Sequence, residues 1–215
     1  MPHQTLSLFL CSCLIYFNCS AASPPELSKI LLADNQAITE ITGWIYKNLE
    51  LIRTNETERN ALALRIHDRL NNVRQQYKEF IKEHPKNNKA RIAYASFLSH
   101  VDNRQGAVDQ WKQSLKNEPN NAAALNNLAA HLGSTAIYSN NKEGLREAFR
   151  AMEKTVSIDP KQPLYHHNYA TLLCSFPSKA SEHYKIDLNK VILKALQEYN
   201  LAIILDPDNF EFAAD

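Results

Sequence analysis

Four prolines divide most of the chain into segments of one plan, and this repetition constrains the fold more than any other feature of the sequence. They are Pro85, Pro119, Pro160 and Pro207. The first interval is 34 residues, and the next two are 41 and 47 residues, which indicates one unit with insertions of 7 and 13 residues. A period of this size is typical of a solenoid, in which one helical unit is stacked repeatedly because it cannot bury its apolar face alone.

Each segment carries an alanine with a leucine three residues later, ahead of its proline. The four pairs are Ala61 and Leu64, Ala95 and Leu98, Ala129 and Leu132, and Ala170 and Leu173. In the cleanest copy, residues 88–121, the spacing predicts a first helix with Ala95 and a second with Ala107 and Trp111. The small alanines let two antiparallel backbones approach, and the proline ends the second helix because it lacks an amide hydrogen.

The other copies depart from this plan in different ways. In the first copy, Val73 replaces the alanine of the second helix. The third copy has an insertion from Ser134 to about Glu143, and the fourth has one over residues 175–189. Because the fourth insertion contains Pro177 and many polar residues, we expect a loop that lengthens into the second helix.

The first 22 residues resemble a secretory signal peptide. An apolar run over residues 6–17 is followed by small residues at 20–22. The first Lys or Arg is Lys29, which departs from the usual positive start and leaves a short hydrophobic anchor as the alternative. Lipid attachment at Cys13 or Cys19 is not favoured, because the residues around each cysteine fit that signal poorly.

The mature chain would keep only Cys174, so it cannot form an internal disulfide. An exported protein without disulfides fits a bacterial periplasm or cell envelope, with secretion as the alternative.

Apolar residues at three-and-four spacing in residues 23–53 predict one amphipathic helix or two short ones, which would cover the first face of the stack. Gly43 within it marks a kink or a close contact. At the other end, residues 210–215 read as the opening of a further first helix. We therefore expect either a truncated product or a terminal face completed by a partner.

The composition excludes several classes of function. The formal net charge is +1, and the Lys and Arg residues are interspersed with acidic ones, so no nucleic-acid partner is expected. The four glycines are scattered and form no phosphate-binding loop. No segment of the mature chain is predicted to be an integral membrane span.

No catalytic or metal site is predicted. Adjacent His166 and His167 point about 100° apart on a helix, so they cannot easily share one ion, with or without His183. We expect one of the two to be packed and the other to face a groove. Cys174 follows two leucines and is expected to be packed or partly buried, without a base to activate it. The chain is therefore predicted not to be an enzyme and to need no cofactor.

The repeated residues resemble the tetratricopeptide repeat (TPR) family over about residues 54–209. The family's central first-helix motif is similar to segments 127–129 (Asn-Leu-Ala) and 168–170 (Asn-Tyr-Ala). The pair of residues that closes the family's repeat is similar to the Asp-Pro pairs at 159–160 and 206–207. The aromatic residue expected early in the first helix is absent. At this position the four repeats have Thr57, Arg91, Leu125 and His166.

The resemblance implies an all-α fold, a right-handed α-solenoid of antiparallel helix pairs preceded by an N-terminal helix. The expected organisation is a signal peptide (1–22), an N-terminal helix or cap (23–53), a divergent first repeat (54–87), a second repeat (88–121), a third with an insertion (122–162), a fourth with a longer insertion (163–209), and the start of a further helix (210–215).

In the TPR family, the first helices line a concave groove that binds peptides or helices of partner proteins. The resemblance places six residues in that groove here: Ile92, Ser96, Asn126, Ala130, His167 and Thr171. These positions are mostly uncharged, so a ligand clamped by its terminal carboxylate is not favoured. Asn126, Asn127 and Asn168 are candidates to hydrogen-bond a peptide backbone. The alternative is that Asn127 and Asn168 bridge adjacent repeats.

The leading hypothesis is a non-catalytic scaffold that presents this groove to a protein or peptide ligand. The alternative is the recruiting arm of a larger envelope enzyme whose catalytic part lies beyond Asp215, and a third is a structural spacer in an envelope assembly.

Overall fold

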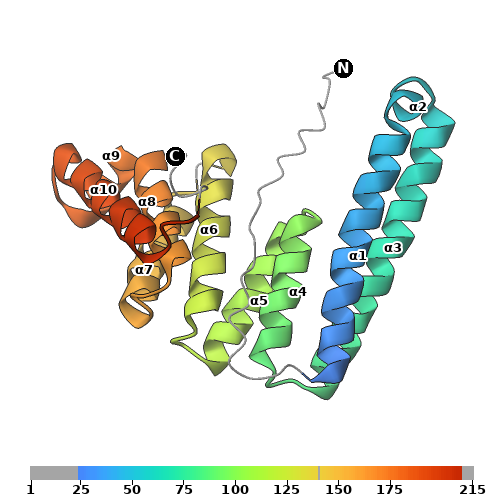
Figure 1. Cartoon of the computed structure of the whole chain (residues 1–215), viewed down its shortest axis with the longest axis horizontal. Helices are drawn as coiled ribbons and strands as arrows, with labels where there is room; N and C mark the ends of the chain where they lie inside the picture. The colour runs from blue at the N-terminus through green and yellow to red at the C-terminus, as the bar shows by residue number, and fades with distance from the viewer. Residues whose placement is uncertain (1–23, 140, 210–215) are drawn as a thin grey trace.

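The computed structural model describes residues 24–139 and 141–209, which form ten helices and no strand (Figure 1). The helices are α1 (Pro25–Lys47), α2 (Leu49–Thr54), α3 (Glu56–Glu83), α4 (Asn88–His100), α5 (Arg104–Asn117), α6 (Ala122–Ser139), α7 (Lys142–Ile158), α8 (Pro163–Ser175), α9 (Pro177–Tyr184) and α10 (Leu188–Leu205). The expected all-α array of antiparallel helix pairs is confirmed.

The helices stack as a solenoid requires. Helices α4 and α5, α6 and α7, and α8 and α10 form the pairs. Each first helix also contacts the next, α1 with α4, α4 with α6 and α6 with α8, while α5 contacts α6 and α7 contacts α8. The first helices therefore form one continuous row, which runs along the array from the N-terminal hairpin to α8 (Figure 1).

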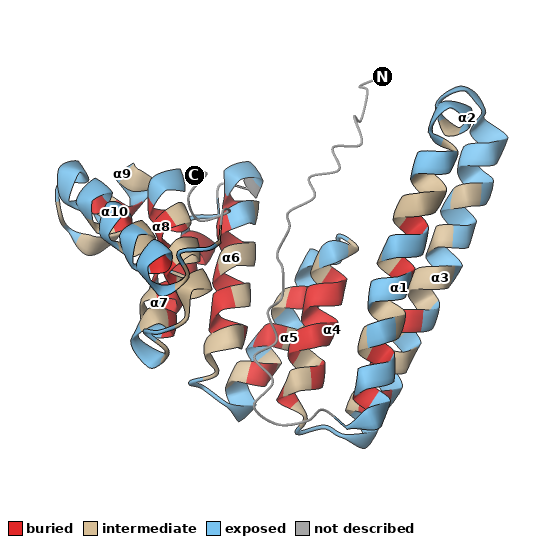
Figure 2. Ribbon diagram, viewed as in Figure 1, coloured by how far each residue is buried: buried red, intermediate tan, exposed pale blue. Residues whose placement is uncertain are grey.

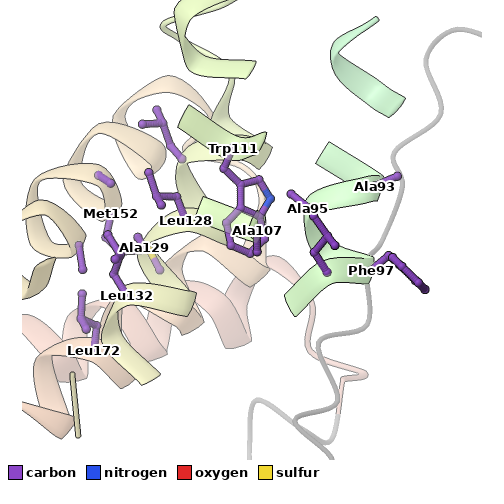
Figure 3. Packing of buried hydrophobic residues seen from close by; sticks show 14 of the residues in the cluster. Ala93, Ala95, Phe97, Ala107, Trp111, Leu128, Ala129, Leu132, Met152 and Leu172 are labelled. Carbon is purple, nitrogen blue, oxygen red and sulfur yellow. The ribbon is translucent and has the colours of Figure 1, made fainter. Parts of the chain in front are cut away.

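The core follows the crossings between these helices (Figure 2). Ala95 on α4 and Ala107 on α5 are fully buried, and Trp111 fills the space beside them (Figure 3). In the next pair, Ala129 and Ala148 are also fully buried. The small residues predicted at the crossings are thus where two helices approach closely, and the larger apolar residues close the gaps around them.

The four prolines end helices as predicted. Each is the second residue after the last helical one, at the ends of α3, α5, α7 and α10. Most helices begin with an asparagine or aspartate whose side chain accepts a hydrogen bond from the backbone amide three residues on. These caps are Asn55, Asn87, Asn103, Asn121, Asn141 and Asp187. Such a cap contributes about 1 kcal/mol.

The N-terminal hairpin differs from the predicted first repeat. Residues 56–83 form one continuous helix, α3, in which Leu64 is 66% exposed. The buried residues of its second half, among them Val73 and Tyr77, pair with α1 instead. The predicted turn between Leu64 and Val73 is absent because that stretch contains no glycine or proline to interrupt the helix. Helix α1 therefore acts as the first helix of this pair.

Polar contacts join α1 to α3, among them two hydrogen bonds between side chains. The Tyr77 hydroxyl donates to Asp34 Oδ2 at 2.8 Å, and Arg69 Nε donates to Glu40 Oε2 at 2.8 Å. Burial raises the pKa of Asp34, and the hydrogen bond from Tyr77 opposes that shift. Both contacts lie along the length of the hairpin, which extends beyond the neighbouring pair (Figure 1).

The segment expected to be one amphipathic helix or two short ones forms a 23-residue helix, α1, followed by the six-residue α2. The break falls at Asn48, between α1 and α2. Gly43 lies inside α1, and a Cβ added there would meet no atom within 4 Å. The close contact that was one of the two expectations for Gly43 is therefore absent.

The two insertions are mainly helical. The third-copy insertion extends α6 to Ser139, and α7 begins at Lys142. The fourth-copy insertion contains α9 where we expected a loop, with Pro177 as its first residue and Ala180 buried. Proline is favoured at the first position of a helix, because the amide hydrogen it lacks has no partner there. Lys185, with φ of 55°, then turns the chain into α10.

The expected signal peptide, residues 1–22, and the expected start of a further helix, residues 210–215, lie outside the described residues. Within the described part of the chain, no helix is both long and apolar enough to cross a membrane.

Candidate protein-binding groove

The six predicted groove residues lie on three consecutive first helices. They are Ile92 and Ser96 on α4, Asn126 and Ala130 on α6, and His167 and Thr171 on α8. Residues four apart share one face of a helix, and α6 contacts both α4 and α8. We call the surface formed by these six residues the inner row.

The inner row is more buried than the sequence suggested. Ile92, Ser96 and Asn126 are buried, with Asn126 only 3% exposed. Ala130, His167 and Thr171 are half-buried. The accessible part of the row therefore lies over α8 and the middle of α6.

A ladder of side-chain hydrogen bonds crosses the row. Asn168 Nδ2 on α8 donates to Asn126 Oδ1 on α6 at 2.9 Å, and Asn126 Nδ2 donates to Asn127 Oδ1 at 3.1 Å. Asn127 Nδ2 in turn donates to Ser96 Oγ on α4 at 3.5 Å. A buried amide needs such partners, because an unsatisfied one costs about 1–3 kcal/mol. Asn127 and Asn168 therefore do bridge adjacent repeats.

Close packing of α6 on α8 brings these amides within reach. Gly133 lies so near α8 that a Cβ there would be 2.7 Å from Leu172 Cδ1, a separation that real Cβ atoms essentially never show. The absence of a side chain at Gly133 allows the two helices to approach.

At the α8 end of the row, Tyr199 of α10 joins the two predicted residues. The Thr171 hydroxyl donates to the His167 carbonyl at 2.9 Å, so the Tyr199 hydroxyl, 3.1 Å from Thr171 Oγ1, is the donor to it. The Tyr199 ring meets the His167 ring edge-on at 5.5 Å. The sequence analysis did not place Tyr199 here, although it is the fourth-copy counterpart of Trp111.

His131 is a second residue that the sequence analysis missed. Its Nδ1 lies 2.9 Å from Ser99 Oγ of α4, and its ring packs 5.4 Å from the Trp111 ring. Burial lowers the pKa of His131, Arg104 lowers it further, and Asp102 opposes them. His131 is therefore neutral at pH 7, and it links α4, α5 and α6 as a hydrogen-bonding and packing residue.

The two adjacent histidines divide as expected. His166 is buried, with Nδ1 2.6 Å from Glu198 Oε2 and Nε2 3.0 Å from the Pro160 carbonyl oxygen, while His167 belongs to the inner row. His183 lies against the rings of Phe149 and Tyr184, on α9. Among the described residues, no group of three or more His, Cys, Asp or Glu side chains could hold a metal ion.

Cys174 is exposed, which corrects the expectation of a packed or partly buried site. It lies near the C-terminal end of α8. Desolvation raises the pKa of its thiol, so the reactive thiolate is a minor form at neutral pH.

Comparison with known proteins shows the fold. No protein-family model matches the chain, and no curated protein matches it in sequence. Two solved structures of MamA align with it, residue 41 to the end of MamA from Desulfovibrio magneticus RS-1 and an ArsTM double mutant of MamA RS-1. Each is 18% identical and covers 76% of this chain and 78% of its own length, with a TM-score of 0.51.

A thermophilic TPR protein from Thermus thermophilus, TTC0263, is 14% identical, and the alignment covers 72% of this chain and 92% of TTC0263. Its TM-score is 0.44, and we base no structural argument on it. At these identities the likeness to MamA concerns the fold alone. Together with the stacked helix pairs and their terminal prolines, it shows that this chain has a TPR-like fold.

Proposed function

We propose that this chain is a non-catalytic scaffold that holds a protein or peptide partner on its inner row. The observation that supports this proposal is the amide ladder, which aligns polar side chains on three touching helices. The half-buried Ala130, His167 and Thr171 flank that ladder.

The chemistry of the row suits a peptide backbone. A primary amide has two N–H donors and an oxygen that can accept two hydrogen bonds, and the ladder uses one N–H from each of the half-buried Asn127 and Asn168. Neighbouring helix axes lie about 8–10 Å apart. An extended peptide rises about 3.3 Å per residue, so successive helices would meet every third residue of the ligand.

The preferred ligand is extended, uncharged and rich in small side chains near α6. The six row residues carry no formal charge at pH 7 with His167 neutral, so the row does not favour a terminal carboxylate. Ala130 leaves room for a ligand side chain between the helices, and the His167 ring offers an edge for packing.

The site of action in this proposal is the bacterial periplasm or cell envelope, with secretion as the other outcome. It rests on the apolar segment and the small residues within residues 1–22. Expression of the full chain in an exporting host tests it. A mature N-terminus near residue 23 in the periplasmic fraction supports export, and an intact Met1 on a cytoplasmic protein contradicts it.

The binding proposal is tested by site-specific photo-crosslinking. A photoreactive phenylalanine analogue at Ala130 should capture a discrete partner in envelope extracts. The same analogue at Leu64, which is 66% exposed on α3, should not. Adding Thr171→Val, which removes the hydroxyl that Tyr199 binds but keeps the side-chain shape, should reduce the yield at Ala130 at least threefold.

Circular dichroism of each variant verifies that the helices are intact. If Ala130 and Leu64 give the same crosslinks, or if Thr171→Val leaves the yield unchanged in a folded protein, the inner row is not the binding surface.

A further inference from the structure

A buried histidine and a buried carboxyl group join the two helices of the last pair, α8 and α10 (Figure 1). The side chains of His166 on α8 and Glu198 on α10 are only 6% and 14% exposed. His166 Nδ1 lies 2.6 Å from Glu198 Oε2, and Nε2 lies 3.0 Å from the carbonyl oxygen of Pro160, in the turn that leads into α8. We call the two side chains, His166 and Glu198, the latch.

The partners of His166 require one proton more than a neutral ring and an ionised carboxylate contain. A neutral imidazole has one N–H donor and one acceptor nitrogen. The Pro160 carbonyl oxygen can only accept, so Nε2 must donate to it, and Nδ1 of a neutral ring is then an acceptor. An ionised Glu198 also only accepts, so the 2.6 Å contact would join two acceptors. One additional proton, on Nδ1 or on Oε2, removes that conflict.

We propose that the latch is proton-dependent: in the folded protein it holds one shared proton at neutral pH, and that proton keeps α8 closed on α10. In the unfolded chain both groups are in water, where the carboxyl group is ionised and a histidine loses its proton at about pH 6.5. Folding above pH 7 therefore takes up one proton at the latch, and a rise in pH opposes folding of the last pair.

The elements packed around the latch bring other titratable groups to this end of the array. Burial raises the pKa of Tyr169 on α8 and of Tyr184 on α9, so these phenols are neutral below pH 9. Burial lowers the pKa of His183 on α9, so its ring is neutral above pH 7. Helix α6 faces α8 with the uncharged Asn126 and Gly133. The remaining groups are Glu153 of α7, Asp159 of the preceding turn, Tyr165 and His167 of α8, and Lys194 of α10. All of these groups are common to the wild-type chain and to the variant used below, so their effects cancel in the comparison.

The latch adjoins the α8 end of the inner row, but the proposal does not depend on a ligand there. Tyr199 follows Glu198 on α10, and its hydroxyl lies 3.1 Å from Thr171 Oγ1. Loss of the shared proton loosens α10 from α8 and with it this contact. The direction is opposite to that of His131, whose lowered pKa affects stability only when the pH falls.

The test compares the pH dependence of unfolding in the full wild-type chain and in Glu198→Gln. A glutamine amide can present its N–H to Nδ1, so a neutral ring satisfies both contacts without the extra proton. Urea unfolding followed by circular dichroism gives the unfolding equilibrium constants at pH 7 and pH 9. Release of one proton on unfolding raises the wild-type constant by up to about tenfold per pH unit. The ratio of the wild-type constant to that of Glu198→Gln should therefore rise about tenfold between the two pH values. A ratio that changes by less than about twofold overturns the proposal.

Nuclear magnetic resonance of the labelled wild-type chain locates the proton directly, and this measurement needs no variant that folds. At pH 7.5 the His166 ring should carry a proton on both nitrogens, or one ring N–H beside a protonated Glu198 carboxyl group. The neutral His131 ring, with one N–H, is the control in the same spectrum. A single N–H on His166 beside an ionised Glu198 contradicts the shared proton and overturns the proposal.

Discussion

Ser114 offers a direct measurement of what a polar residue costs inside this solenoid. It lies on α5 with 0% exposure, and its Oγ has no hydrogen-bond partner among the described residues. An unsatisfied buried hydroxyl costs about 1–3 kcal/mol, and alanine is also the better helix former by roughly 0.5 kcal/mol. Because serine and alanine differ by one oxygen, Ser114→Ala leaves only a small void. We expect it to stabilise the fold by about 1–2 kcal/mol.

The matched control lies one repeat further along. Thr155 of α7 occupies the position equivalent to Ser114 and is equally buried, but its hydroxyl donates to the Ala151 carbonyl at 2.8 Å. Thr155→Val keeps the shape and removes a satisfied hydrogen bond, so it should destabilise the fold by about 0.5–1 kcal/mol.

Urea unfolding followed by circular dichroism measures the change in the free energy of unfolding for both variants. In thermal unfolding, a gain of 1 kcal/mol in that free energy should raise the melting temperature by about 2–4 °C for a chain of this size. If Ser114→Ala destabilises the protein as much as Thr155→Val does, the Ser114 hydroxyl has a partner in solution and the reasoning fails.

Three further changes follow from the same geometry. Gly43→Ala should stabilise the fold by about 0.5–1 kcal/mol in urea unfolding, because the added Cβ meets no atom within 4 Å and alanine favours the helix. Glu198→Ala should cost about 1–3 kcal/mol, since it removes the hydrogen-bond partner of the buried His166 Nδ1, whereas Glu198→Gln, which keeps an oxygen there, should cost about 1 kcal/mol. Burial lowers the pKa of His131 in the folded protein. As the pH falls below about 6.5, the ordinary pKa of a histidine, His131 therefore takes up a proton in the unfolded chain before it does so in the folded one. The contribution of His131 to stability should therefore be full above that pH and decrease below it, and His131→Asn should show a smaller decrease in urea midpoints measured across this range.

The parts of the fold that depend on neighbouring residues along the chain could be read from the sequence. A proline ends a helix whatever surrounds it, so all four terminal prolines were identified, and with them the ends of α3, α5, α7 and α10. The buried alanines at the crossings, such as Ala95 and Ala107, follow from the same repeat.

The errors arose where one local signal has two meanings. Residues 61–64 carry the alanine and leucine of a first helix, but no residue between Leu64 and Val73 interrupts the helix, so α3 continues and α1 becomes its partner. Pro177 was interpreted as a loop residue, although proline both ends helices and begins them. Only the packing of Ala180 against the last pair decides between the two readings.

The inner row shows why the candidate site was only partly predictable. The resemblance to the TPR family assigned the six row residues to first helices, and the structure places them on α4, α6 and α8. Exposure depends instead on how closely the next helix approaches, and that distance is set by residues outside the row. Asn126 of α6 is 3% exposed and accepts a hydrogen bond from Asn168 of α8, which makes it a member of the ladder. Asn126 is thus a structural amide, and the row residues that remain half-buried are Ala130, His167 and Thr171.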